Sequence, residues 1–321
     1  MEISTYQFEF RNYQRQFHSP LKTTHGSWTV REGIILRFTD KMGKVSYGEI
    51  APISWFGSET IEQAKAFCAQ LPQELTQEII FSIPDTLPAC QFGFESALED
   101  VSDREHHLEC SALLPAGEAA LETWQKLWNE GYRTFKWKIG VDAIAQELEV
   151  FARLMRLPVM AKLRLDANGG LRYDQAKLWL QTCDRFAEDP AISVEVEYLE
   201  QPLAVAEFTA MLELNRCYKC AIALDESVAT LQQLQKCYHQ GWRGIFIIKP
   251  VIAGSPSRLR QFCHQYQIDA VFSSVFETQI GKSVALKLAT ELSSPQRVIG
   301  FGVDHLFPED SHWLENLWNT R

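Results

Sequence analysis

The sequence predicts an α/β fold in which a parallel barrel is joined to a separate α+β module. Charged residues recur at the ends of successive predicted strands, at intervals of roughly 24 to 34 residues: Lys138, Asp166, Glu200, Asp225 and Lys249. Each interval is about the length of one strand, one helix and two loops, as in a series of βα units. The first hundred residues lack this rhythm, which indicates a second unit.

The amino-terminal module, residues 1–100, alternates polar and apolar residues in the manner of antiparallel strands. The segments with this period of two are ISTYQFEF, ILRFTD and KVSYGEI. The segment TIEQAKAFCAQL then predicts an amphipathic helix, with Ser58 as its expected N-cap. Mixed strands and helices of this kind indicate an α+β unit.

The second unit, residues 101–300, alternates short apolar strands with helical stretches, and the change of pattern begins at CSALLPAG. Eight strands are expected: CSALL, TFKWKI, KLRLDA, VEVEYLE, CAIALDE, GIFIIKP, AVFSSVFE and VIGFG. The last stretch, residues 301–321, is rich in Trp and Pro, and we expect it to return to the first module.

Composition excludes several classes of protein. The 321 residues carry a formal charge of −10 and no run of Lys or Arg, which argues against a nucleic-acid partner. No apolar stretch approaches the roughly 18 residues of a membrane helix, and the amino terminus lacks the order of a secretory signal, so we expect a cytoplasmic protein. Cys217 and Cys220 form a lone CxxC without a second pair, so reduced thiols are expected rather than a zinc site.

Two lysines are predicted to share one face of a strand. Side chains alternate along a strand, so Lys136 and Lys138 point to one side and Trp137 to the other. Two neighbouring ammonium groups disfavour each other's charge, which lowers the pKa of at least one lysine toward the range of a general base. A pair of solvated lysines on an edge strand would give the same pattern.

Three carboxylates arrive from consecutive strands. Asp166, Glu200 and Asp225 offer oxygen ligands without His or Cys, which favours Mg²⁺ or Mn²⁺ over zinc. Any one of them alone could be a helix cap or a loop residue, but three in register indicate a site. Lys249 ends an apolar strand and is expected across the barrel mouth from Lys138. With a divalent cation and the lysines, the site suits a small anionic carboxylate substrate.

The motif set resembles the enolase superfamily, in its muconate lactonizing enzyme subgroup, along nearly the whole chain. The matching segments are KWK, LRLDANGG, EYLEQPL, IALDES, IIKP and SSVFET. The resemblance implies a modified TIM barrel, (β/α)7β, formed by residues 101–300. It also implies an α+β capping domain formed by residues 1–100 and completed by residues 301–321. By the same resemblance Lys138 is the general base, Asp166, Glu200 and Asp225 hold Mg²⁺, and Lys249 is the opposing lysine.

Within the subgroup, the length and the segments SALLPAG, GEIAPISWFGSET and LRLDANGG are most similar to the o-succinylbenzoate synthase family. That family implies a hydro-lyase of menaquinone or phylloquinone biosynthesis. Its Mg²⁺-dependent syn dehydration converts 2-succinyl-6-hydroxy-2,4-cyclohexadiene-1-carboxylate to o-succinylbenzoate. Lys138 would take the α-proton and then protonate the departing hydroxide, while Lys249 would stay charged.

Further residues are candidates for substrate contact: Arg164, Asn168, Ser273 and Ser274. An interior salt bridge would equally explain Arg164, and strand-end hydroxyls the two serines. Two segments combine Gly with aromatic residues as a lid does, His18 to Trp28 and Pro52 to Ser58.

Two other functions remain open on the sequence. Lysines on opposite faces also suit a 1,1-proton transfer, as in an N-acylamino acid racemase or a dipeptide epimerase. The acidic DxD motif of many dipeptide epimerases is absent, with only Glu277 and Asp304 near the last strands. A non-catalytic scaffold with a relic site is the alternative of another class, although a relic has no reason to keep paired charges in one cavity.

Overall fold

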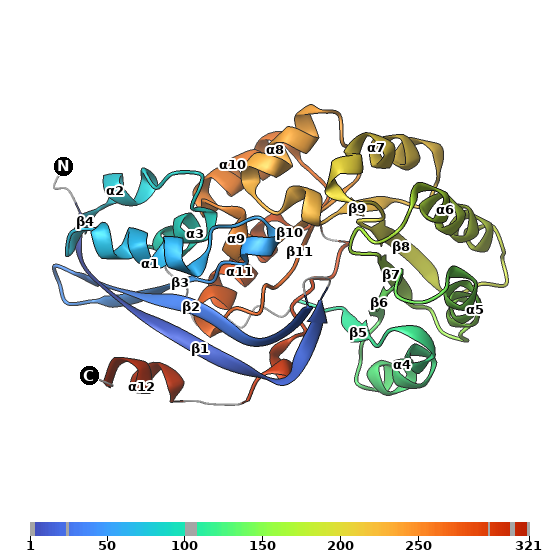
Figure 1. Ribbon diagram of the computed structural model, residues 1–321, viewed down its shortest axis with the longest axis horizontal. Helices are drawn as coiled ribbons and strands as arrows, with labels where there is room; N and C mark the ends of the chain where they lie inside the picture. The colour runs from blue at the N-terminus through green and yellow to red at the C-terminus, as the bar shows by residue number, and fades with distance from the viewer. Residues whose placement is uncertain (1–3, 24–25, 100–107, 295, 309–311, 320–321) are drawn as a thin grey trace.

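The computed structural model describes residues 4–23, 26–99, 108–294, 296–308 and 312–319. Its strands form two sheets (Figure 1): a four-stranded sheet in the order β3-β2-β1-β4 and a seven-stranded sheet in the order β11-β10-β9-β8-β7-β6-β5. The first sheet is antiparallel and the second parallel. None of the helices in the described ranges has the length and apolar character that crossing a membrane requires.

The antiparallel sheet belongs to the amino-terminal module. Its strands are β1 (Thr5–Thr23), β2 (Gly26–Asp40), β3 (Val45–Ile50) and β4 (Glu74–Thr76). Each of the three predicted strand segments overlaps one of these strands, β1, β2 or β3. The segment His18 to Trp28, one of the two segments expected to form a lid, is the outer end of the β1–β2 hairpin, and its residues 24–25 lie outside the described residues.

Short helices complete this module: η1 (Ser54–Phe56), α1 (Ile61–Gln70), α2 (Gln77–Phe81) and α3 (Pro88–Ser96). The expected N-cap of α1 was wrong by two residues. Thr60 is the cap, because its hydroxyl accepts from the Gln63 N–H at 3.1 Å and the Gln63 side chain accepts from the Thr60 N–H at 2.8 Å. The Ser58 hydroxyl instead accepts from the Ile53 N–H at 2.7 Å, which fixes the turn around η1.

The carboxyl-terminal helix α12 (Trp313–Asn319) lies against this same sheet. The Trp313 ring is 5.9 Å from Tyr13 on β1, and the Trp318 ring is 6.3 Å from Tyr47 on β3. The described segments β1 and α12 therefore lie in one unit, and the residues of the parallel sheet come between them in the sequence.

The parallel strands are β5 (Ala112–Leu114), β6 (Thr134–Lys138), β7 (Lys162–Asp166), β8 (Glu195–Glu200), β9 (Ile222–Leu224), β10 (Ile245–Ile248) and β11 (Ala270–Phe272). They lie within seven of the eight expected segments. The eighth, VIGFG, forms only isolated bridges, from Ile299 to Cys110 and from Gly300 to Ser273. These bridges join the segment before β5 to the segment after β11, so the curved sheet closes into a barrel.

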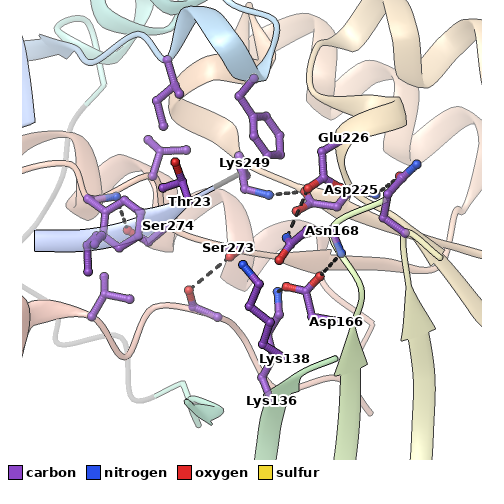
Figure 2. Close-up of a pocket in the computed structure, with 18 of the residues that line it drawn as sticks. Thr23, Lys136, Lys138, Asp166, Asn168, Asp225, Glu226, Lys249, Ser273 and Ser274 are labelled. Atoms are coloured by element: carbon purple, nitrogen blue, oxygen red, sulfur yellow. Dashed lines mark hydrogen bonds and ion pairs between the residues drawn. The ribbon is translucent and has the colours of Figure 1, made fainter. Parts of the chain in front are cut away.

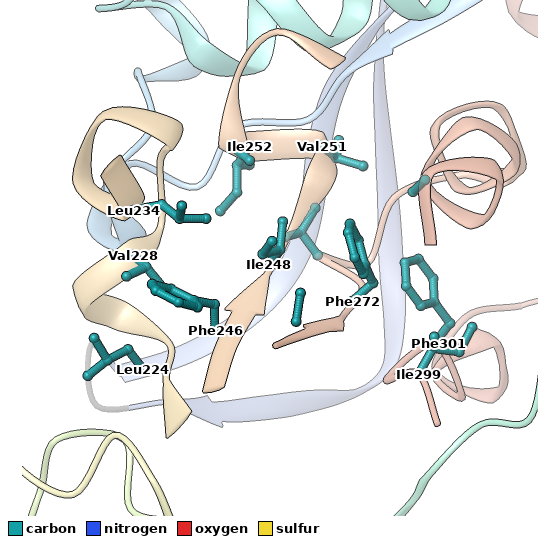
Figure 3. Close-up of a cluster of buried hydrophobic side chains, with 14 of the residues drawn as sticks. Leu224, Val228, Leu234, Phe246, Ile248, Val251, Ile252, Phe272, Ile299 and Phe301 are labelled. Atoms are coloured by element: carbon teal, nitrogen blue, oxygen red, sulfur yellow. The ribbon is translucent and has the colours of Figure 1, made fainter. Parts of the chain in front are cut away.

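Helical segments connect the parallel strands and cover their outer side. They are η2 (Gly117–Ala119), α4 (Ala120–Asn129), α5 (Ile144–Met155), α6 (Tyr173–Ala187), η3 (Val205–Glu207), α7 (Phe208–Cys217), η4 (Glu226–Val228), α8 (Leu231–His239), α9 (Pro250–Ala253), α10 (Pro256–Tyr266), α11 (Gln279–Leu292) and η5 (Asp304–Leu306). Apolar side chains fill the space between helices and strands, as Phe246, Ile248 and Leu234 do (Figure 3). None of the eight cysteines, all of which lie in the described ranges, is joined in a disulfide bond, and Cys217 is exposed.

Candidate active site

A cavity of about 1010 Å³ lies between the capping sheet and the mouth of the barrel. The cap contributes Leu21 and Trp28 from the β1–β2 hairpin and Phe56 from η1. The barrel contributes charged and polar side chains from the carboxyl ends of its strands (Figure 2). Those ends meet at one face in any parallel barrel, so residues far apart in the sequence converge there.

The two predicted lysines both line this cavity. Lys136 and Lys138 lie on β6, and Trp137 between them is fully buried on the other side, against Trp179. The Lys136 ammonium is 2.8 Å from Asp166 Oδ2 and 2.7 Å from Glu200 Oε1. Burial alone would lower the pKa of Lys136, but Asp166 and Glu200 together raise it well above its usual value. The two carboxylates therefore favour the charged form of Lys136.

The three predicted carboxylates come from three adjacent strands. Asp166 and Glu200 are the last residues of β7 and β8, and Asp225 directly follows β9. Asp166 and Glu200 are direct neighbours across the paired strands. All three side chains are buried, with residue exposures of 7%, 1% and 3%. Burial of three acids in one place requires positive charge close by.

Lysines supply that charge. Lys249 follows β10 and its ammonium forms an ion pair with Asp225, as Figure 2 shows. The same ammonium lies 4.1 Å from the centre of the Phe56 ring, a cation–π contact between barrel and cap. Lys138 and Lys249 both line the cavity, so two lysines border the same space.

The donor set fits a divalent cation. Glu200 Oε2 is buried without a hydrogen-bond partner among the described residues. Burial first, and then the neighbouring Asp166 charge, raise the pKa of Glu200 well above its usual range. Both observations mark a carboxylate that lacks a counter-charge on one oxygen, and oxygen-only ligands of this kind suit Mg²⁺. Asp166 and Asp225 would complete the set.

As they stand, no three His, Cys, Asp or Glu side chains in the described ranges are grouped closely enough to enclose a metal ion. The Lys136 ammonium contacts both Asp166 and Glu200, and Lys249 contacts Asp225. The two ammonium groups therefore neutralise part of the negative charge of the three carboxylates. The three acids would have to move closer together around an ion.

Three of the four candidate substrate contacts lie at the cavity. Asn168, Ser273 and Ser274 line it. The Ser273 hydroxyl donates to the Gly300 carbonyl at 3.3 Å, and the Ser274 hydroxyl donates to Glu277 Oε2 at 2.8 Å. The Ser274 hydroxyl also accepts from the Phe276 N–H at 2.9 Å. Each hydroxyl keeps acceptor capacity for one further group.

Arg164 lies elsewhere. It points into the barrel interior, is 1% exposed and pairs with Glu197 at 2.6 Å. Its guanidinium also donates to the Val298 carbonyl at 2.7 Å. The cavity lining does not include it, so the structure places this residue in the interior salt bridge that the sequence left open.

Two residues that sequence reasoning missed belong to the site. Glu226 lines the cavity, and burial together with Asp225 and Asp166 raises its pKa to about 7. It accepts a 3.2 Å hydrogen bond from the Asn168 side chain. Gln201, which follows Glu200, is fully buried and bonds to the backbone of Asp225. The only available signal was adjacency to the predicted ligands, because neither residue continues the strand alternation.

The comparisons with known proteins cover nearly the whole chain. Residues 119–317 match the family model described as "Enolase C-terminal domain-like", and residues 7–101 match "MenC, N-terminal domain". An o-succinylbenzoate synthase from Thermosynechococcus vestitus is 41% identical over 305 residues, 92% of each chain. The o-succinylbenzoate synthase of Yersinia enterocolitica is 30% identical over 82% of this chain and 80% of its own.

Solved structures agree with these relatives. The crystal structure of o-succinylbenzoate synthase from Thermosynechococcus elongatus, complexed with Mg in the active site, aligns with a TM-score of 0.88 and 38% identity. The alignment covers 98% of this chain and 100% of that one. An L-Ala-D/L-Glu epimerase from Bacillus subtilis aligns with a TM-score of 0.76 at 20% identity, over 97% and 92% of the two chains, which shows a shared fold. The predicted barrel with its capping domain and the predicted lyase family are therefore confirmed: this chain belongs to the o-succinylbenzoate synthase family of the enolase superfamily.

Proposed function

We propose that this chain dehydrates 2-succinyl-6-hydroxy-2,4-cyclohexadiene-1-carboxylate to o-succinylbenzoate with Lys138 as the general base. The observation that carries the proposal is that Lys136 and Lys138 have different contacts. Lys136 holds two carboxylates, whereas Lys138 forms no ion pair or hydrogen bond within the described ranges and faces the cavity. A general base must be able to reach the substrate proton without breaking an ion pair, and the position of Lys138 allows this.

Asp166, Glu200 and Asp225 would hold the Mg²⁺ ion named in the related structure, with Mn²⁺ as a possible substitute. When bound, this ion would polarise the substrate carboxylate and so acidify the adjacent C–H bond. Lys136 would remain the fixed cation between Asp166 and Glu200, which preserves their spacing.

Lys138 would first accept a proton from the substrate and then donate it to the leaving group. The neutral Lys138 amine removes the proton α to the carboxylate, and the electron pair left on carbon is drawn toward the carboxylate. As the ring C–O bond breaks, the Lys138 ammonium returns that proton to the departing hydroxide, which leaves as water from the same face. Lys249, which is paired with Asp225, would stabilise the negative charge that develops on the substrate.

The remaining lining would select the substrate. Asn168, Ser273 and Ser274 offer polar contacts, while Leu21, Trp28 and Phe56 cover the apolar ring. Arg164 would act on the barrel interior and not on the substrate. We further propose residues 1–100 with 301–321 as the capping domain, residues 101–300 as the catalytic barrel, and a cytoplasmic location on the sequence grounds above.

The test separates this reaction from proton transfer alone. Purified protein with Mg²⁺ should remove the diene absorbance of the cyclohexadiene substrate.

The opposed Lys138 and Lys249 also favour a second candidate, N-acylamino acid racemisation. Exchange of the α-proton of an N-acylamino acid in deuterated water, without diene turnover, would establish that activity instead. A protein with neither activity and no Mg²⁺ affinity would be a scaffold.

A further inference from the structure

Gln201 makes contacts at the ends of all three strands that carry the proposed metal ligands. It directly follows Glu200 at the end of β8 and is fully buried. Its φ of 34° lies in the left-handed region, which residues other than Gly seldom adopt. Strain of this kind persists only where surrounding contacts hold the residue in place, and it gathers at functional sites.

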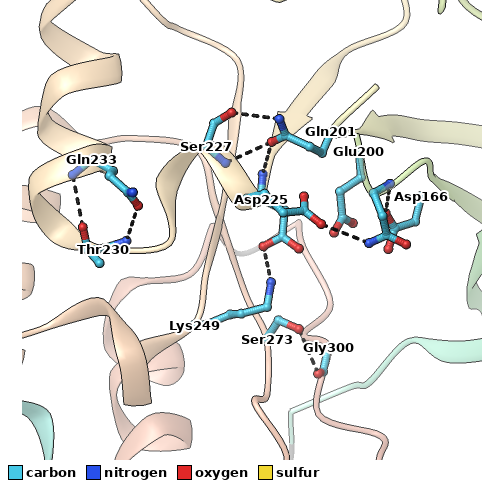
Figure 4. Close-up of polar contacts among 12 residues, drawn as sticks. Asp166, Glu200, Gln201, Asp225, Ser227, Thr230, Gln233, Lys249, Ser273 and Gly300 are labelled. Carbon is cyan, nitrogen blue, oxygen red and sulfur yellow. Dashed lines mark hydrogen bonds and ion pairs between the residues drawn. The ribbon is translucent and has the colours of Figure 1, made fainter. Parts of the chain in front are cut away.

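The Gln201 side chain fixes the end of β9. Its Oε1 accepts from the Asp225 N–H at 3.0 Å and from the Ser227 N–H at 3.2 Å, as Figure 4 shows. Its Nε2 donates to the Ser227 hydroxyl at 2.8 Å and to the Leu203 carbonyl at 2.9 Å. One amide group therefore holds the turn from which the Asp225 carboxylate points toward the cavity.

The Gln201 backbone fixes the other two strand ends. Its N–H donates to the Ala223 carbonyl at 2.8 Å, which keeps β8 in register with β9. Its carbonyl accepts from the Gly169 N–H at 2.7 Å, which holds the loop after β7. Asp166 lies three residues before Gly169. Gln201 therefore restrains the ends of all three strands that carry the acidic residues.

Three buried carboxylates repel one another wherever the ammonium groups of Lys136 and Lys249 do not neutralise them, so the backbone that carries them has to be held in place. We propose that Gln201 is a positioning residue that fixes the strand ends carrying Asp166, Glu200 and Asp225, so that small side-chain movements suffice for the three carboxylates to capture a divalent cation. This inference rests on the metal role proposed for those acids. Residues behind metal ligands commonly set affinity because they limit the ligands' freedom.

Magnesium titration by calorimetry on the otherwise substrate-free protein tests the proposal. Gln201→Met keeps the length of the side chain but removes the amide, and should weaken Mg²⁺ binding about 10- to 100-fold. Ser227→Ala is the matched control, because it removes one acceptor of Gln201 and leaves both bonds to Oε1; its affinity should stay within about threefold of the wild type. If Gln201→Met does not fold, Gln201→Asn, which shortens the reach of the amide, carries the same expectation.

A second readout separates positioning from chemistry. In Gln201→Met, saturating Mg²⁺ should restore kcat to near the wild-type value, while the Mg²⁺ concentration for half-maximal rate rises. Wild-type affinity in a folded Gln201→Met protein would overturn the inference, as would a low kcat that Mg²⁺ cannot restore. If the wild type itself binds no Mg²⁺, the proposed metal site fails first and the inference falls with it.

Discussion

Lys136 and Lys138 lie two residues apart on β6, and their surroundings give them different chemistry. Lys136 is 21% exposed in its side chain and contacts two buried acids, so it is held as a cation. Lys138 faces the cavity and has no such partner within the described ranges. The sequence predicted that proximity would lower the pKa of at least one lysine; for Lys136 the acids outweigh that effect.

Replacing Lys136 should therefore act mainly on stability in the absence of metal. Lys136→Met leaves Asp166 and Glu200 without their ammonium partner and should lower the free energy of unfolding by about 3 kcal/mol. Added Mg²⁺ should recover more stability in this variant than in the wild type. Thermal unfolding with and without Mg²⁺ measures both effects. Lys126→Met, whose side chain is 78% exposed, is the control, and an equal loss in the two variants would contradict the account.

Glu277 gives a prediction for pH. Burial raises the pKa of Glu277 to about 7. Hydrogen bonds from the Val275 N–H and the Ser274 hydroxyl favour the ionised carboxylate, but the effect of burial is larger. Between the ordinary glutamate pKa and about 7, the folded protein keeps a proton there that the unfolded chain has released. The contribution of Glu277 to stability therefore falls as pH rises through this interval. Glu277→Gln should flatten the dependence of Tm on pH, and an unchanged slope would refute the assignment.

At the residue scale, strand alternation was sufficient to predict some of the site and not all of it. Asp166 and Glu200 were predictable because each ends a regular strand. Glu226 was not, because β9 ends at Leu224 and the η4 turn brings two consecutive acids to one cavity. The left-handed φ of Gln201 depends on contacts from three loops, which no local pattern contains.

At the scale of elements, the end of β3 joins the cap to the barrel. Glu49 is fully buried and accepts hydrogen bonds from the Thr278 N–H at 2.9 Å and the Gly281 N–H at 2.9 Å, at the start of α11. The Tyr13 hydroxyl donates to the same carboxylate at 2.5 Å. A negative charge at a helix N-terminus meets unpaired N–H groups and the positive end of the helix dipole.

Glu49→Gln should weaken this joint, because an amide offers one acceptor where the carboxylate offers two. We expect a loss of about 2 kcal/mol or more in the free energy of unfolding. Urea unfolding of the variant and the wild type measures it. Glu32→Gln, at a half-buried position bonded to Gln14, should cost little. Equal stability of Glu49→Gln and the wild type would show that the carboxylate does not hold the two units together.

The β1–β2 hairpin shows why the lid was only partly predictable. Its outer end contains Pro20, which has no N–H to donate to a neighbouring strand. The sequence around Pro20 therefore predicts a loop. The structure accommodates it at a register shift, where pairing passes from Gln16 with Val30 to Leu21 with Trp28. Pairing resumes beyond this irregularity, so Leu21 and Trp28 still reach the cavity as strand residues.

At the scale of the whole molecule, the fold class, seven of the parallel strands and the amino-terminal unit were predictable because each depends on local periodicity. Closure of the barrel was not, because Ile299 and Gly300 form single bridges to segments far away in the sequence. The cavity is also a property of the whole chain. Its lining comes from the cap hairpin, η1 and the ends of the barrel strands together.

Metal binding should be visible in global stability. A ligand that binds only the folded state stabilises it by RT ln(1 + [L]/Kd), or about 2.7 kcal/mol at one hundred times Kd. Mg²⁺ should therefore raise the Tm of the wild type, and a chelator should reverse the rise. Asp166→Asn should abolish the response, because it removes one of the three proposed ligand charges. An equal Mg²⁺-induced rise in that variant would exclude Asp166 as a ligand.

The assignment of Lys138 as the base is the central claim, and turnover of the cyclohexadiene substrate with saturating Mg²⁺ tests it most directly. Loss of diene absorbance should be rapid in the wild type and at least about 10²- to 10⁴-fold slower in Lys138→Ala, with Mg²⁺ affinity and Tm preserved. Dehydration at an undiminished rate in a folded, metal-binding Lys138→Ala protein would contradict the account.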